Sequence, residues 1–77
     1  VVMHNDDFTT MEFVVEILIT IFNKGREEAA ALMMAVHKNQ KAVVGTYSYD
    51  IARTKAEEAE RQARAEGFPF RLTVEEA

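Results

Sequence analysis

The chain contains no cysteine and no tryptophan, and it has one proline and three glycines among its 77 residues. Without cysteine, neither a disulfide framework nor a zinc–thiolate cluster can supplement the core, and catalysis by a thiol is excluded. The packing of apolar side chains, which make up 48% of the residues, must therefore hold the fold together. We expect residues 1–77 to form a single domain, because this length is too small for two.

An excess of positive charge is also missing. The formal net charge is −4 and the isoelectric point is about 5.1, whereas proteins that bind nucleic acids usually present a basic surface. A long apolar run is missing too, since residues 13–22 are interrupted by Glu16 and Thr20 and fall short of the roughly 20 residues that a bilayer span needs. We therefore expect a cytoplasmic protein that binds neither nucleic acid nor membrane.

The first half of the chain predicts one strand and two helices. Residues 1–3 are apolar and favour a strand. Thr9 and Glu12 have the spacing of a capping box, which predicts that Thr9 is the N-cap of the first helix. Apolar residues then recur three and four positions apart, and Gly25 is expected to end this helix in a left-handed conformation. A second helix is predicted from about residue 26 to residue 39.

The second half predicts a strand, a helix and a final strand. Residues 42–47 are β-branched and aromatic, which favours a strand. Ser48 can cap a helix over residues 49–66 that Gly67 ends, and residues 68–74 alternate as a last strand. The narrow inner face of this helix is predicted to contain Ile51, Ala52, Ala56, Ala59 and Ala63. The order β-α-α-β-α-β predicts an α+β fold, with a small three-stranded antiparallel sheet packed against three helices.

Catalytic and metal-binding patterns are absent. Asp6, Asp7 and His37 have no nucleophile to activate, and the hydroxyl groups near them are explained by helix initiation. The Asn-Asp-Asp run lacks the spacing of a calcium loop, no paired-histidine helix motif occurs, and the isolated glycines cannot form a phosphate cradle. We therefore expect no enzymatic activity, no metal and no cofactor.

The remaining polar groups suit the recognition of an ammonium group. An asparagine oxygen and a neutral imidazole nitrogen can each accept a hydrogen bond from an ammonium, and an aspartate adds favourable charge. Asn5, Asp6 and His37 provide these groups. Deformable apolar walls could come from Met11, Val14, Met33 and Val36. The alternative is that the histidine makes a structural hydrogen bond and the methionines belong to the core.

The motif Asn-Asp-Asp-Phe-Thr at residues 5–9, followed by residues 11–15, Leu32-Met33 and the Ala-Val-His run at residues 35–37, resembles the bacterial ClpS adaptor family. The resemblance continues through residues 45, 54–55 and 69–76 and so covers the whole chain. It implies the same α+β fold. It also implies that the chain recognises N-degrons, which are proteins with an exposed N-terminal Leu, Phe, Tyr or Trp, and delivers them to the ClpAP protease through the ClpA unfoldase.

The resemblance also implies a role for individual residues. Asn5 and His37 would hydrogen-bond the α-amino group of the substrate, Asp6 would act through charge or a water molecule, and Asp7 would secure the peptide backbone or the loop. The side-chain pocket would be lined by Met3, Thr9, Met11, Val14, Met33, Val36 and Phe70. Of these, Met11 would act as a gate against β-branched first residues. The unfoldase would contact exposed residues near the start of the third helix, including Asp50 and Lys55.

The chain departs from the family pattern at several positions. Phe70 replaces a common leucine and is expected to narrow the pocket, Thr10 replaces a common proline, and His4 replaces an aliphatic residue for which the sequence suggests no role. The flexible N-terminal extension of the family is expected to be absent from this chain, and a monomer is expected. The alternative function is a non-enzymatic interaction domain of similar fold that docks through a surface patch and not a pocket.

Overall fold

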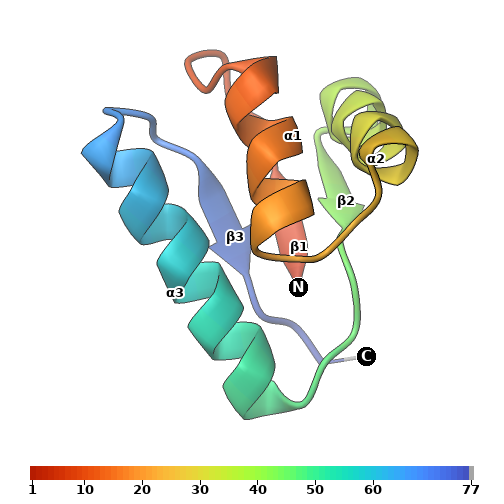
Figure 1. Cartoon of the computed structure of the whole chain (residues 1–77), viewed down its shortest axis with the longest axis vertical. Coiled ribbons are helices and arrows are strands. Elements are labelled where there is room, and N and C mark those ends of the chain that lie inside the picture. The colour runs from red at the N-terminus through yellow and green to blue at the C-terminus, as the bar shows by residue number, and fades with distance from the viewer. Residues whose placement is uncertain (77) are drawn as a thin grey trace.

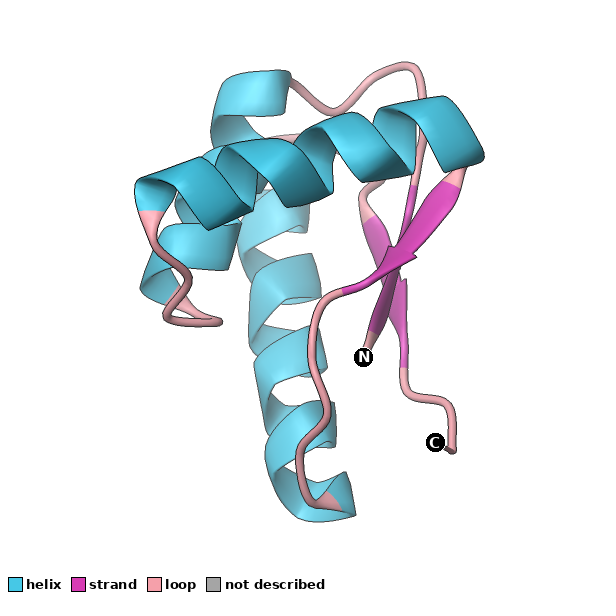
Figure 2. Ribbon diagram, turned by 90° about the vertical axis from the view of Figure 1, so that its right-hand side faces the viewer, coloured by secondary structure: helices cyan, strands magenta, loops and turns pink. Residues whose placement is uncertain are grey.

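Three helices cover one face of a three-stranded antiparallel sheet (Figures 1 and 2). The structure is a computed structural model that describes residues 1–76. The chain runs through β1 (Val2–His4), α1 (Met11–Thr20), α2 (Arg26–Asn39), β2 (Lys41–Val43), α3 (Tyr49–Ala65) and β3 (Arg71–Thr73). This order confirms the β-α-α-β-α-β fold that the sequence predicts.

The first strand lies in the centre of the sheet. The strand order is β2-β1-β3, and Met3 pairs with Ala42 on one side and with Leu72 on the other. Met3 is fully buried, so this row of the sheet faces the helices, and the neighbouring residues of β1 face away because successive side chains alternate. After β1, the backbone N–H of Asn5 donates to the carbonyl of Gln40 over 2.8 Å. This bond holds the start of the following loop against the residue before β2.

The close packing of α3 depends on a stripe of alanines. Ala52, Ala56, Ala59 and Ala63 are all buried, and their spacing of four, three and four residues places them on one helix face. Ile51 was also predicted on this face, but it is half exposed. The reason is its position next to Ala52, because adjacent residues point about 100° apart around a helix.

Threonine 10, and not Thr9, caps α1. Thr10 has extended backbone angles, and its hydroxyl oxygen accepts a hydrogen bond from the backbone N–H of Phe13 over 3.2 Å. The hydroxyl of Thr9 donates instead to the carboxylate of Asp6. The capping box predicted between Thr9 and Glu12 is therefore wrong, because a nearby aspartate takes the hydroxyl that the spacing assigned to the helix.

The two predicted glycine stops have different outcomes. Helix α1 ends at Thr20, and Asn23, not Gly25, adopts the left-handed conformation, with φ of 57°. Gly25 is extended and precedes α2 as its N-cap. At the end of α3, Gly67 has φ of 80°, its N–H donates to Arg64, and the next N–H reaches back to Ala63. This pair of bonds is a Schellman motif, which confirms the predicted stop at Gly67.

Both outer strands are shorter than predicted. The sequence predicts strands over residues 42–47 and 68–74, but β2 and β3 each have three residues. The central strand also has three residues, and the N–H of Val44, which donates to the carbonyl of Val1, continues its pairing with β2 by one residue. Ser48 precedes α3 at the N-cap position without a side-chain capping bond. Within residues 1–76, none of the helices has the length and apolar character needed to cross a membrane.

Candidate functional site

A small cavity lies where the loop after β1 meets α1 and α2. Its volume is about 190 Å³. The loop contributes its polar side, while α1 and α2 contribute the apolar side together with one histidine. The lining residues are Asn5, Asp6, Asp7, Thr9, Met11, Val14, Met33, Val36 and His37. The cavity thus brings together residues of the first loop and of α2 that are about 30 positions apart in the sequence.

The carboxylate of Asp6 gives the loop its shape. One oxygen accepts hydrogen bonds from the backbone N–H groups of Phe8 and Thr9, over 2.8 and 2.7 Å, and the other accepts from the Thr9 hydroxyl over 2.7 Å. An aspartate that binds the backbone two and three residues later stabilises a turn, and its charge strengthens these bonds. The resemblance implies that Asp7 secures the peptide backbone or the loop, and Asp7 is exposed. The three bonds show that Asp6 secures the loop, so contact with a peptide backbone stays the prediction for Asp7.

Asn5 and His37 present their polar atoms without a protein partner. Asn5 is half-buried, His37 is exposed near the end of α2, and both line the cavity. Within residues 1–76, neither side chain makes a hydrogen bond to another residue, in contrast to the histidine at position 4. The alternative interpretation was that His37 makes a structural hydrogen bond. Among the described residues, its side chain makes no such bond. Both groups are free to accept from a ligand.

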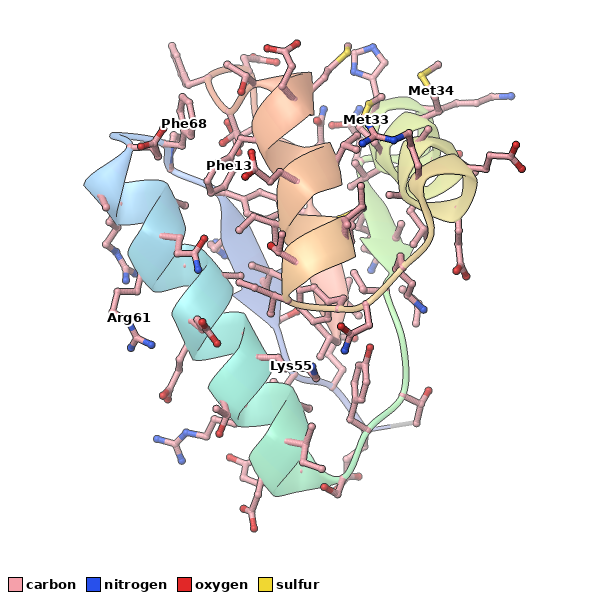
Figure 3. The ribbon with its side chains drawn as sticks, viewed as in Figure 1. Phe13, Met33, Met34, Lys55, Arg61 and Phe68 are labelled. Atoms are coloured by element: carbon pink, nitrogen blue, oxygen red, sulfur yellow. The ribbon has the colours of Figure 1, made fainter. Side chains whose placement is uncertain are left out.

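The apolar side of the cavity has a fixed floor and adaptable walls. Val14 and Val36 are buried in the main core, so their positions are set by the packing of α1 and α2. Met11 is 48% exposed and Met33 is half-buried. Figure 3 shows Met33 on α2, at the end of the molecule where α1 begins. Methionine has three rotatable bonds, so these two walls can adjust to side chains of different shape.

Two residues predicted for the pocket lie in the core and do not line the cavity. Met3 is fully buried and belongs to the same core cluster as Val14 and Val36, the two residues that form the floor of the cavity. Phe70 is also buried, and its ring packs edge-on against Phe13, with 6.2 Å between ring centroids. The expectation that Phe70 narrows the pocket is therefore wrong. Its ring packs against α1 from the residue just before β3, so a contact with a residue far away in the sequence decides its position.

Of the two residues predicted to contact an unfoldase, one has a structural role. Lys55 is half-buried, and its ammonium donates to the backbone carbonyl of Ile21 over 2.7 Å. It also lies 5.5 Å from the ring centroid of Tyr47 and 6.0 Å from that of Phe22. Figure 3 shows Lys55 between α3 and the C-terminal end of α1. The prediction that Lys55 is exposed is wrong, whereas Asp50 is exposed in the first turn of α3.

We expect the substitution Lys55→Met to lower the free energy of unfolding by about 1 kcal/mol, because it removes a charge-assisted hydrogen bond that solvent partly screens. Urea denaturation followed by circular dichroism measures the change. Lys41→Met is the control, because Lys41 is exposed and makes no ion pair within residues 1–76. Equal midpoints for the two variants would show that the bond to Ile21 contributes nothing.

The role of His4 was missed by the sequence analysis. Its Nε2 atom lies 2.9 Å from the hydroxyl of Thr73, on the face of the sheet away from the helices. The pairing of Val2 with Thr73 places this hydroxyl diagonally opposite His4. Because side chains alternate along a strand, the sequence could have placed His4 on the same outer face as Val2. Its hydrogen-bond partner, Thr73, depends on the register between β1 and β3, which the sequence does not show. Within residues 1–76, no group of three or more histidine, aspartate or glutamate side chains is placed to hold a metal ion.

Comparisons with known proteins agree with the fold and with the resemblance. The sequence profile described as "ATP-dependent Clp protease adaptor protein ClpS" matches residues 1–73. The ClpS adapter of Desulforapulum autotrophicum is 49% identical over 75 residues, which is 97% of this chain and 72% of that protein. The ClpS adapter of Neisseria gonorrhoeae is 54% identical over 72 residues, which is 94% of this chain and 69% of that protein.

A solved structure is similar as well. It is described as Agrobacterium tumefaciens ClpS2 bound to L-phenylalaninamide. It superimposes with a TM-score of 0.93 at 38% sequence identity, over 96% of this chain and 89% of that one.

Proposed function

This chain belongs to the ClpS family of Clp protease adaptors, and from that premise we propose that it binds N-degrons. The ligand is a polypeptide with a free α-amino group and a bulky hydrophobic first side chain, namely Leu, Phe, Tyr or Trp. One observation carries the proposal. The cavity joins Asn5 and His37, whose side chains have no hydrogen-bond partner within residues 1–76, to an apolar floor and two methionines.

The chemistry of the cavity matches an N-terminal residue. An α-ammonium has three N–H donors, and the amide oxygen of Asn5 and a neutral ring nitrogen of His37 can accept two of them. The carboxylates of Asp6 and Asp7 add negative charge at the same side of the cavity. Hydrogen bonds to a charged group contribute about 1.5–3 kcal/mol each, and burial of one large apolar side chain contributes about 1.5–3 kcal/mol. Micromolar affinity, about −8 kcal/mol, is within reach of these contributions.

The ligand of the similar structure supports the proposal. L-Phenylalaninamide, which is bound to the Agrobacterium tumefaciens protein, carries a free amine and a phenyl ring on the same residue. These are the two groups that the polar and apolar sides of the cavity would accept. The same proposal has the chain deliver its ligand to a ClpA-type AAA+ unfoldase, in the cytoplasm, as a monomer and without catalysis. Asp50, which is exposed, is the candidate contact for that partner.

Titration with a short fluorescent peptide that begins with a free-amine Phe tests the binding directly. We expect saturable binding in the micromolar range, because one buried side chain and two charge-assisted bonds provide about that much free energy. A peptide of the same composition with Gly first and Phe second is the control. It has the same ring and the same charge, but the two groups are no longer on one residue. Equal binding of both peptides would contradict a site for N-terminal residues.

Alanine substitution separates this function from the alternative, an interaction domain that docks through a surface patch. Asn5→Ala and His37→Ala are each expected to weaken binding of the Phe peptide about 10- to 100-fold, because each removes one acceptor for the ammonium. Fluorescence anisotropy measures the affinity, and circular dichroism verifies folding. His4→Ala is the matched control for the second variant, since His4 lies on the outer sheet face. If both site variants bind like the control, the surface-docking alternative is favoured.

A further inference from the structure

A second hollow runs along the exposed side of α1 to the start of α2. Its volume is about 520 Å³. Met11, Val15 and Ile19 line it at intervals of four residues, which places them in one row along the helix. Figure 1 shows α1 at the front of the molecule, with the segment that leads to α2 passing beside its C-terminal end. This hollow, which we call the α1 groove, adjoins the cavity described above and shares one lining residue with it, Met11.

The α1 groove has an apolar floor and a charged rim in which two glutamates outnumber one arginine. Val15 and Ile19 are half-buried, whereas Glu12, Glu16 and Arg26 are exposed and line the same hollow. Arg26 is the first residue of α2, so the side of the rim that α1 provides is acidic. None of the ion pairs formed within residues 1–76 includes either glutamate. Lysine and arginine side chains suit such a surface, because their methylene stems cover apolar surface while the charged end stays in water beside a carboxylate.

Met11 connects the α1 groove to the cavity. Its side chain is 48% exposed and lines both hollows. Helix α1 has ten residues and is therefore about 15 Å long at 1.5 Å per residue. An extended peptide covers that distance with about four or five residues at roughly 3.3 Å each. The α1 groove has the length of the segment that would follow the first residue of a ligand held in the cavity.

We propose that the α1 groove binds the extended segment after the first residue of an N-degron, and that it selects lysine or arginine there. This inference rests on the proposed function, since it requires the first residue to occupy the cavity. The floor of Val15 and Ile19 contacts the stems of the basic side chains, and Glu12 and Glu16 bind their cationic ends. Substrates with basic early residues are therefore held along α1 in addition to their N-terminal residue.

The test compares three ligands: phenylalaninamide, Phe-Gly-Lys-Gly-Lys-Gly, and the same hexapeptide with glutamate in place of lysine. At low salt, we expect the lysine peptide to bind about tenfold more tightly than the glutamate peptide, because surface charge pairs contribute up to about 1 kcal/mol each. The charge reversal Glu16→Lys should weaken the lysine peptide about fivefold and leave phenylalaninamide unchanged. Ile19→Ser should weaken the lysine peptide about twofold through the lost contact with its stems.

Glu58→Lys is the matched control, because Glu58 is an exposed residue of α3 outside the α1 groove and its reversal changes the net charge equally. Isothermal titration calorimetry gives each affinity. Equal weakening of the lysine peptide by both reversals, or equal affinity for the lysine and glutamate peptides, would overturn the groove while leaving the cavity intact. Failure of phenylalaninamide to bind the unsubstituted chain would overturn the proposed function itself.

Discussion

A peptide that begins with Nα-acetylated Phe is expected to bind this chain about a thousandfold more weakly than the same peptide with a free amine, since two charge-assisted hydrogen bonds of about 2 kcal/mol each are lost. Acetylation removes the positive charge and leaves one N–H donor. The acceptors on Asn5 and His37 then face a neutral amide, and the carboxylates of Asp6 and Asp7 lose the charge that they would attract.

Competition against the fluorescent Phe peptide measures this loss. The acetyl group also adds bulk, so the control ligand is a peptide in which 3-phenylpropionyl replaces the first Phe. This ligand keeps the ring and has a hydrogen atom in place of the amine, without the added volume. We expect it to bind as poorly as the acetylated peptide. Affinity of either ligand within about threefold of the free amine would show that the ammonium is not recognised, since such a factor is below the value of one hydrogen bond.

The second large effect is expected for Asp6→Ala. The substitution removes all three hydrogen bonds that the carboxylate accepts from Phe8 and Thr9. Because Asp6 is only half-buried, solvent compensates part of the loss, and we expect the free energy of unfolding to fall by about 2 kcal/mol. Binding of the Phe peptide should fall about 100-fold, because the loop that orients Asn5 and Thr9 loses its shape along with a negative charge.

Urea denaturation and anisotropy titration measure the two effects on the same samples. Asp7→Ala is the matched control, because it removes the neighbouring charge from an exposed residue without a bond to the loop. It should leave stability unchanged and weaken binding only a few-fold. Asp6→Asn should fall between the two, since an amide oxygen can still accept from both backbone N–H groups. If Asp6→Ala and Asp7→Ala behave alike, the loop does not depend on Asp6.

The sequence predicted those features that depend on local spacing. The period of three and four predicted one apolar face on each of α1 and α2, and Val14 and Val36 on these faces are buried. That Met11 and Met33 share a pocket with them was only a possibility from spacing and was implied by the resemblance; all four line one cavity. The Schellman stop at Gly67 was likewise local. In these cases the neighbours that decide the conformation lie within a few residues of one another in the chain.

The errors share a physical cause, because each depends on a contact that spacing does not contain. The spacing predicted Thr9 as the N-cap of α1, but its hydroxyl donates to the carboxylate of Asp6. Lys55 was predicted at the surface because its partner, the carbonyl of Ile21, belongs to the C-cap of α1, 34 positions away in the sequence. Phe70 was assigned to the pocket by resemblance, whereas its ring packs against Phe13. Spacing along the sequence therefore could not predict which of two groups wins a hydrogen bond, or which residues from distant segments come into contact. Both depend on the packing of the folded chain.

The central position of β1 has a consequence for the order of folding. One edge of β1 pairs with residues 41–43 and the other with residues 71–73, so the second edge is closed by a segment about 70 positions away in the sequence. Contacts between such distant segments form late, because a long loop must close first. The loop at Asn5 extends directly from this strand. We therefore expect this loop to become fixed late in folding, when β3 pairs with β1, although β3 contributes no residue to the lining of the cavity.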